Sequence, residues 1–219
     1  MKDRSNYISN NILIKVSDLP IINTAYMKTL LGNSKNTIIN LSRWEGKDYL
    51  IRLKKGVYTT KTFLEHTDKT KYIELIANKL LSDSYLSDTY ILSKNGILTD
   101  ITHTITSVTT TTTREIKNPL GRFYYRSIRP ELFTHYTNYR YGDYFIHYAK
   151  PYKALFDYFY FRKDYFIFSY KYVESLRFNW ENIDVSDMNK FLYLCKAHRL
   201  DKMTKICNFL ISFKKDYVY

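Results

Sequence analysis

Apolar residues between Thr24 and Gly32 recur at intervals of three or four, which predicts an amphipathic helix. The residues on its apolar face are Tyr26, Met27, Leu30 and Leu31. Thr24 has a side chain suited to capping the start of this helix, and Gly32 can adopt the left-handed conformation that ends one. Asn33 is expected to turn the chain, so a second element should follow directly.

A second helix is predicted from a cap at Ser34 to a stop at Gly46. Ile38, Leu41 and Trp44 recur every three residues and are expected to form its apolar face. The polar residues of this helix are then expected on its other faces, where solvent or a partner can reach them.

The pattern changes after this helix to two short strands, Tyr49 to Leu53 and Val57 to Thr60. They are joined at Lys54, Lys55 and Gly56, where glycine can supply the positive backbone angle of a hairpin turn. A helix, a tight turn, a second helix and a hairpin with a basic tip predict a winged helix-turn-helix, over about Ser17 to Thr60.

Longer elements follow, and they predict a mixed second domain. The expected elements are helices over Thr70–Leu81 and Leu86–Asn95, a strand over Thr104–Thr113, a turn at Pro119–Gly121, a strand over Arg122–Ile128, a strand around Tyr144–Tyr148, and helices over Pro151–Arg162, 187–199 and 201–213. The expected fold class is therefore α+β. Its predicted domains are a winged helix-turn-helix in residues 1–60 and an α+β domain in residues 61–219.

The chain of 219 residues carries a formal net charge of +13, which makes a polyanion the default partner. Residues 1–60 hold ten Lys or Arg against four Asp or Glu, and residues 61–219 hold 24 against 17. The excess of positive charge is therefore denser in the first segment. The composition, 45% hydrophobic with 6 Gly and 4 Pro, excludes a disordered or collagen-like chain.

Polar residues of the second predicted helix and of the hairpin are candidate DNA contacts. Lys35, Asn36 and Asn40 are expected to meet base edges, because Asn can bond adenine twice and Lys can reach guanine acceptors. The residues expected to hold phosphates are Arg43, Arg52, Lys54 and Lys55. The alternative is a winged helix used only for protein contact, with these side chains as an ordinary solvated face.

A second basic cluster lies in the middle of the chain and comprises Arg114, Lys117, Arg122, Arg126 and Arg129. A period of two places Arg122 and Arg126 on one face of their strand. This face could extend a DNA footprint or receive an acidic or RNA partner. A charged, solvated sheet face is the equally ordinary interpretation.

The sequence holds no motif for catalysis, a cofactor or a metal. The glycines are too dispersed for a phosphate loop or a nucleophile elbow, and the histidines lack zinc-ligand spacing. We therefore expect neither an enzyme nor a small-molecule substrate. Cys195 and Cys207 are expected to be core thiols, and without a signal peptide or membrane span the expected location is cytoplasmic.

Four longer phrases carry a resemblance. They are LIRLKKGVY (Leu50–Tyr58), IANKLLSDSYLSDTYILSKNGIL (Ile76–Leu98), TITSVTTTTTREIKNPLGRFYYRSIRPELF (Thr104–Phe133) and YAKPYKALFDYFY (Tyr148–Tyr160). In this order they resemble the AbiEi-type antitoxins of bacterial type IV toxin–antitoxin and abortive-infection systems, with the related AbiEi-like transcriptional regulators. Tyr152 stands where this family often has an acidic residue.

The resemblance implies a winged helix that binds inverted repeats in its own promoter and represses the operon. It also implies a C-terminal domain that counteracts a nucleotidyltransferase-like toxin, and it supplies no catalytic residues. Two alternatives stay open: a protein- or RNA-interaction module with incidental DNA binding, and a plain regulator without a toxin.

Overall fold

The computed structural model describes residues 11–32, 34–100 and 102–218. Contacts divide the chain into two compact units, one formed by residues 1–76 with 116–121 and the other by residues 77–115 with 122–219. Helices and two sheets confirm the mixed α+β class. The functional boundary expected after Thr60 stays a prediction, since these units are defined by contacts alone.

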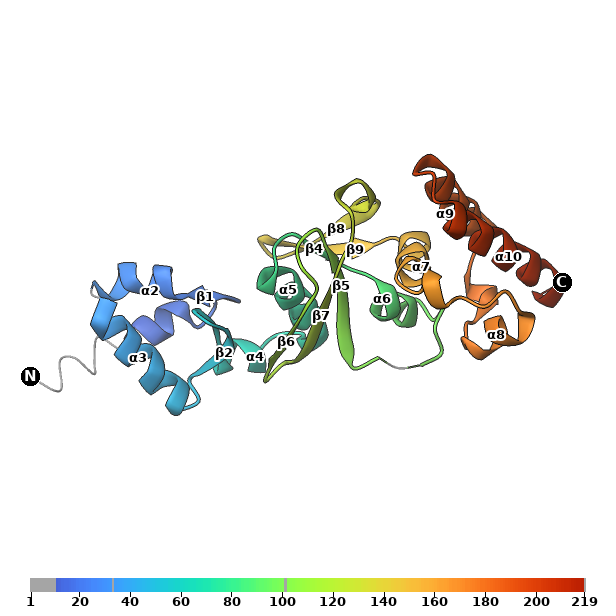
Figure 1. Ribbon diagram of the computed structural model, residues 1–219. Coiled ribbons are helices and arrows are strands. Elements are labelled where there is room, and N and C mark those ends of the chain that lie inside the picture. The colour runs from blue at the N-terminus through green and yellow to red at the C-terminus, as the bar shows by residue number, and fades with distance from the viewer. Residues whose placement is uncertain (1–10, 33, 101, 219) are drawn as a thin grey trace, which may run out of the picture. The chain divides into compact units, whose positions relative to one another are not determined.

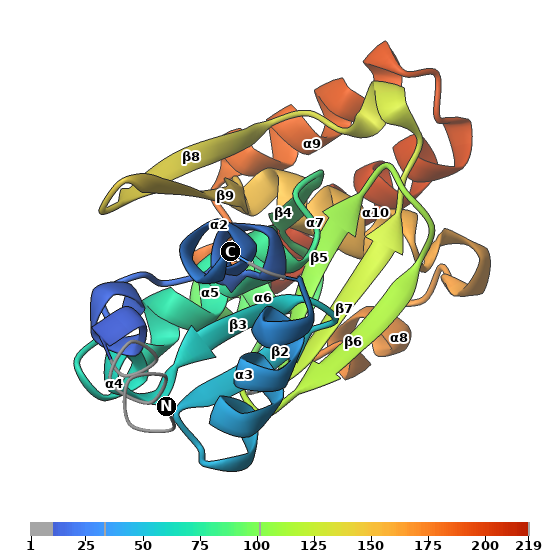
Figure 2. The same cartoon turned by 90° about the vertical axis from the view of Figure 1, so that its left-hand side faces the viewer.

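The first unit contains a small antiparallel sheet and a series of helices (Figure 1). Its elements are a helix at residues 11–16, β1 (Ile22–Asn23), α2 (Thr24–Leu31), α3 (Ser34–Gly46), β2 (Leu50–Lys54), β3 (Val57–Thr60), α4 (Lys61–Glu65) and the first part of α5 (Lys69–Leu80). The strand order is β1-β3-β2, and both pairings are antiparallel. Figure 2 shows α3 beside the β2–β3 hairpin, with which it makes contact.

The core of this unit draws one or two side chains from each element between the helix at residues 11–16 and β3. The buried residues are Ile12, Val16, Ile22, Met27, Leu41, Trp44, Leu50 and Tyr58. Trp44 is the largest of them and is only 2% exposed. Since burying an aromatic side chain is among the larger single contributions to a small core, Trp44 is the main anchor of α3.

The ends of α2 and α3 confirm part of the prediction and correct part of it. The N-cap of α2 is Asn23, whose side chain accepts a hydrogen bond from the Tyr26 amide at 2.7 Å, so the prediction of Thr24 was wrong. Gly32 ends α2 in the left-handed conformation, as predicted. Helix α3 begins at Ser34, the residue predicted to cap it, and the cap itself stays a prediction. The turn predicted at Asn33 lies outside the described residues.

The buried face of α3 differs from the predicted one by one position. Thr37, Leu41 and Trp44 are buried, whereas Ile38 is 60% exposed. A helix turns every 3.6 residues, so a buried line follows steps of four and three, and two consecutive steps of three drift away from it. The apolar face predicted from Ile38 was therefore wrong at that residue.

The predicted hairpin is confirmed as β2 and β3, with Leu50 paired to Thr60 and Arg52 paired to Tyr58. Gly56 has a φ of +75°, the positive angle expected at the turn. Its carbonyl accepts a hydrogen bond from the Thr24 amide at 2.9 Å. The tip of the hairpin is thereby fixed to the start of α2.

A six-stranded sheet with the order β6-β7-β5-β4-β9-β8 forms the centre of the second unit. Its strands are β4 (Ser84–Leu86), β5 (Thr104–Thr109), β6 (Arg114–Asn118), β7 (Gly121–Ser127), β8 (Tyr136–Tyr141) and β9 (Tyr144–Ala149). The pairs β5·β7 and β4·β9 are parallel. The tip of the β6–β7 hairpin, residues 116–121, belongs to the first unit.

Helices cover both faces of this sheet (Figure 1). The end of α5 lies on one face, where the Tyr125 hydroxyl donates to the Ala77 carbonyl at 2.6 Å. Helices α6 (Asp88–Lys94) and α7 (Pro151–Tyr160) lie on the other face. The remaining helical elements are η1 (Pro130–Leu132), η2 (Lys163–Tyr165), α8 (Tyr170–Ser175), η3 (Trp180–Asn182), α9 (Val185–Ala197) and α10 (Asp201–Val218).

The predicted helices over α5, α7, α9 and α10 and the strand at β9 are confirmed to within a few residues. Two expectations were wrong, and two strands were missed. The helix predicted from Leu86 begins only at Asp88, because Leu86 ends β4. The strand predicted over Thr104–Thr113 ends at Thr109, and β6 and β8 were not predicted.

Cys195 and Cys207 are both buried and free, as predicted for core thiols. Burial raises the pKa of the Cys195 thiol to about 12. Among the described helices, none combines the length and apolar character that crossing a membrane requires.

Candidate nucleic-acid interface

The surface of α3 that faces away from the core carries most of the predicted base contacts. Lys35 and Asn36 are exposed, and Asn40 and Arg43 are half-buried. An Arg43 guanidinium nitrogen donates to the Asn40 side-chain oxygen at 2.7 Å. Asn40 therefore has its acceptor engaged, and its amide nitrogen is the group that can still donate to a ligand.

The predicted phosphate contacts of the hairpin lie around its turn. Arg52 and Lys55 are exposed, and Lys54 is half-buried beside a register shift between Arg52 and Lys54. This shift interrupts the regular pairing of β2 with β3 just before the turn.

A hollow of about 640 Å³ in the first unit collects several of these cations. Its charged lining residues are Arg52, Lys54, Lys61, Lys117, Glu45 and Asp48. Four cations against two carboxylates give the hollow a net positive charge, which suits it to a phosphate group. Lys117 of the second predicted cluster thus lies with the hairpin cations.

The other members of the second cluster do not form one continuous basic patch. Arg129 pairs with Glu131 at 3.2 Å, and Arg114 donates to the Thr112 hydroxyl at 2.7 Å. Arg122 is exposed on β7, whose buried residues alternate with it, so Arg122 and Arg126 share a strand face as predicted.

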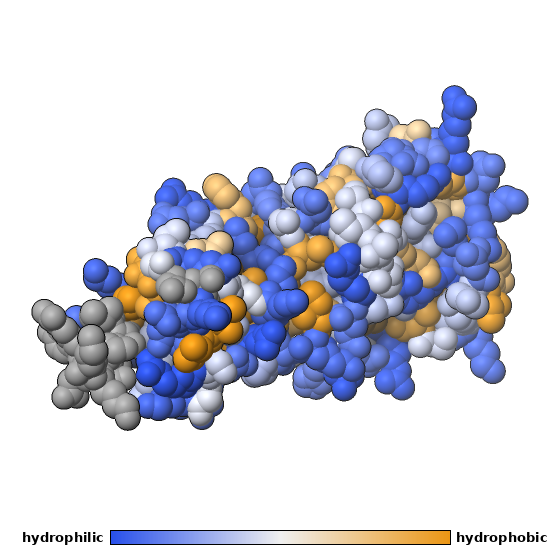
Figure 3. All heavy atoms as spheres, turned by 60° about the vertical axis from the view of Figure 1, so that its left-hand side comes forward, coloured by the Kyte–Doolittle hydropathy of each residue, from blue (hydrophilic) through white to orange (hydrophobic). Residues whose placement is uncertain are grey.

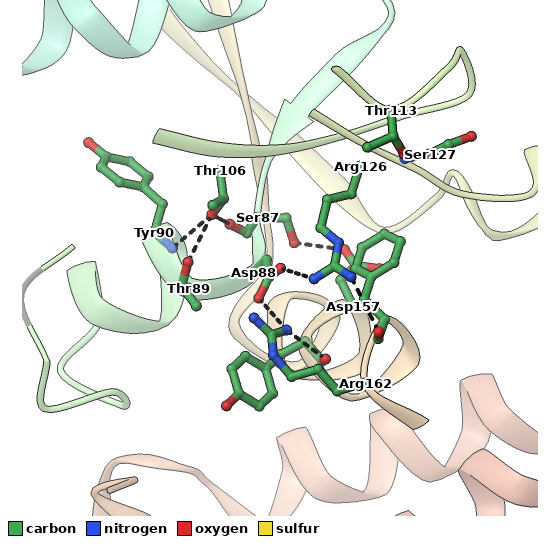
Figure 4. Close-up of polar contacts among 12 residues, drawn as sticks. Ser87, Asp88, Thr89, Tyr90, Thr106, Thr113, Arg126, Ser127, Asp157 and Arg162 are labelled. Carbon is green, nitrogen blue, oxygen red and sulfur yellow. Dashed lines mark hydrogen bonds and ion pairs between the residues drawn. The ribbon is translucent and has the colours of Figure 1, made fainter. Parts of the chain in front are cut away.

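Arg126 takes part in a compact ion-pair network centred on Asp88 (Figure 4). The Asp88 carboxylate is buried and contacts Arg162 at 2.9 Å and Arg126 at 3.4 Å. Burial lowers the pKa of the Arg126 guanidinium, against the opposing effect of Asp88. The two guanidinium groups lie over aromatic rings, Arg126 over Phe161 and Arg162 over Tyr158.

This network engages Arg126, one of the five cations of the second cluster, and its single carboxylate faces two guanidinium groups. Asp88 and Arg162 were not singled out, and no local pattern could have found them, because they lie 74 residues apart in the chain. Asp88 also has a φ of +55°, a conformation that costs free energy for a residue other than glycine. The two arginine contacts offset that cost, so the network is a structural element of the second unit.

A second charged pair is buried beneath the sheet. Lys153 and Asp157, one turn apart on α7, form an ion pair with both side chains almost fully buried. Asp157 also accepts hydrogen bonds from the Tyr85 hydroxyl at 3.0 Å and the Ser87 hydroxyl at 2.7 Å. Burial raises the pKa of Asp157 and lowers that of Lys153, and each partner opposes the shift of the other.

A scan of protein-family models and a search of curated proteins returned no match to this chain.

Proposed function

We propose that the first unit is a winged helix-turn-helix that binds double-stranded DNA. The observation that carries this proposal is α3 itself. Its inner line of Thr37, Leu41 and Trp44 is buried, and its outer surface presents Lys35 and Asn36 to solvent. A recognition helix needs this division, because it must be held rigidly while polar side chains reach base edges.

The order of elements supports the same function. Two helices, α2 and α3, precede an antiparallel hairpin whose turn carries Lys54 and Lys55. In a winged helix the second helix enters the major groove while the hairpin contacts the backbone. Under this proposal Lys35 and Asn36 contact bases, and the hairpin cations contact phosphates.

We propose further that the target lies upstream of the chain's own coding sequence and that binding represses transcription. Binding of the full chain to this upstream duplex and to a scrambled duplex of equal length tests the proposal. A preference of tenfold or more for the upstream duplex is expected, with affinity that falls steeply as salt rises because counterions are released. Equal affinity for both duplexes would contradict sequence-specific binding.

A second proposed function is neutralisation of a nucleotidyltransferase-like toxin by the second unit. It is supported by the AbiEi-like phrases, which contribute β4, α6, β5, β7 and α7, and these elements share one sheet and its covering helices. In the structure the elements of different phrases contact one another, β4 and α6 with β5, and α6 with α7.

Growth rescue in cells that express the neighbouring toxin gene tests this function. The full chain carrying Lys35→Ala and Lys55→Ala is expected to rescue growth as well as the unchanged chain, because both replaced residues lie in the first unit. Loss of rescue in this variant would show that neutralisation depends on DNA binding. Absence of rescue by the unchanged chain would favour the plain regulator.

A further inference from the structure

Two isoleucines lie exposed in the middle of α3, where the sequence pattern had placed one of them in the core. Ile38 is 60% exposed and Ile39 is 62% exposed. Figure 3 shows apolar side chains among hydrophilic ones on the visible face of the first unit. Single exposed apolar residues are common, but this adjacent pair lies on the helix proposed to meet DNA.

The position of Ile39 on the helix is central. At 100° per residue, Ile39 points almost directly away from the line of Thr37, Leu41 and Trp44. Lys35 lies one turn before Ile39 and Arg43 one turn after it on the same surface. The most outward point of α3 is therefore apolar and lies between two cations.

An outward apolar residue between two cations favours one kind of binding partner for α3. The 5-methyl group of thymine is the apolar feature that base pairs present in the major groove, and phosphates line that groove on both sides. A second copy of α3 would instead bring Lys35 and Arg43 against cations like themselves, which is unfavourable. Charge complementarity thus selects DNA over self-association for this surface.

We propose that Ile39 reads thymine, packing against its 5-methyl group when α3 lies in the major groove, so that the bound site contains A·T pairs opposite the middle of α3. The inference rests on the proposed DNA-binding function and specifies which base that function recognises. Lys35 and Asn36 then contact neighbouring base edges, and Arg43 lies toward the backbone.

Replacing thymine by deoxyuridine in the bound site tests this directly, since the exchange removes only the methyl group. The probe is the upstream duplex, trimmed to the segment that the full chain protects. Losing one buried methyl contact is expected to weaken binding of the unchanged chain about fourfold. The variant Ile39→Ala is expected to bind thymine and deoxyuridine duplexes within about twofold of each other.

Ile14 provides a matched control, because it is 69% exposed in the first unit but lies outside α3. The variant Ile14→Ala is expected to keep the full difference in affinity between the thymine duplex and the deoxyuridine duplex. Equal binding of both duplexes by the unchanged chain would overturn the thymine contact, while a retained preference for upstream over scrambled DNA would leave the proposed function standing. An unchanged difference in Ile39→Ala would overturn the role of Ile39.

The other possible occupant of this surface is a second copy of the chain. Sedimentation of the chain without DNA tests for it. If Ile39→Ala dissociates a dimer and leaves the thymine difference unchanged, Ile39 contacts a second copy and the inference is wrong. The expected result is the same sedimentation coefficient for Ile39→Ala and the unchanged chain. If neither duplex is preferred over scrambled DNA, the proposed function fails first and the thymine contact fails with it.

Discussion

Asn23 holds the N-cap position of α2, one residue before the threonine that the sequence favoured. Both residues have capping side chains, and only the backbone distinguishes them: Asn23 is extended, with a ψ of 155°, whereas Thr24 is already helical. Thr24 instead donates through its hydroxyl to the Gly56 carbonyl at 3.3 Å. The choice between adjacent capping residues depends on the pairing of β1 with β3, which no local pattern contains.

Replacing Asn23 tests the cap. Asn23→Ala is expected to lower the free energy of unfolding of the first unit by about 1 kcal/mol, because the Tyr26 amide loses its acceptor. Asn23→Asp keeps an acceptor at this position and is expected to be close to neutral. Urea unfolding of both variants is followed by tryptophan fluorescence in a Trp180→Phe background, in which Trp44 is the only tryptophan. An equal loss in the two variants would contradict the capping role.

The ion pair on α7 gives a prediction for the second unit. Asp157→Ala leaves Lys153 buried without its carboxylate and is expected to lower the free energy of unfolding by about 3–5 kcal/mol. The double variant Lys153→Met with Asp157→Leu removes both charges and is expected to recover a large part of that loss. Thermal unfolding of the full chain measures the stability of both variants. A loss below about 1 kcal/mol in Asp157→Ala would contradict the assignment of a buried ion pair on α7.

At the scale of elements, long helices and the hairpin could be predicted from sequence, because each carries its own periodicity and end signals. Strand β4 could not be recognised: its three residues are all buried, so alternation is absent and the segment merged with the following helix. Strand β8 was missed for the opposite reason. Its residues are almost all exposed at the edge of the sheet, and they pair with β9 through the backbone.

The sequence pattern singled out the charged residues of the candidate interface. It did not indicate that apolar residues of α3 are exposed beside them. Lys35, Arg52 and Lys55 are exposed, whereas Arg43 and Lys54 are half-buried. Helical spacing predicts Ile38 in the core and makes no prediction for Ile39, because apolar residues at helical spacing usually face inward. The burial of Thr37, Leu41 and Trp44 fixes the rotation of α3 and turns these two residues outward.

The division between α3 and the hairpin predicts two kinds of variant. Lys35→Ala is expected to cost about 1–3 kcal/mol on the specific site and little on scrambled DNA, because it removes a base contact. Lys55→Ala is expected to weaken binding to both duplexes alike, because it removes a phosphate contact. Fluorescence anisotropy with each duplex measures the affinity of both variants. The control is Lys196→Ala, because Lys196 is exposed on α9. Equal losses on the two duplexes for Lys35→Ala would contradict the groove assignment.

For the whole molecule, the two compact units correspond to two proposed roles, DNA binding in the first and toxin neutralisation in the second. The overall charge of +13 indicated a polyanion but could not locate its surface. In the second unit, Asp88, Glu131 and Thr112 engage three of the arginines of the predicted cluster. The DNA-binding surface that we propose is the one formed by the cations of α3 and the hairpin in the first unit.

Amide hydrogen exchange of the full chain, measured with and without its upstream duplex, tests the location of that surface most directly. Binding is expected to slow exchange in α3 and in the β2–β3 hairpin and to leave β7 and α7 unchanged. A scrambled duplex at the same concentration is expected to give weaker protection. Protection confined to β7 and its neighbours, with none in α3, would contradict DNA recognition by the first unit.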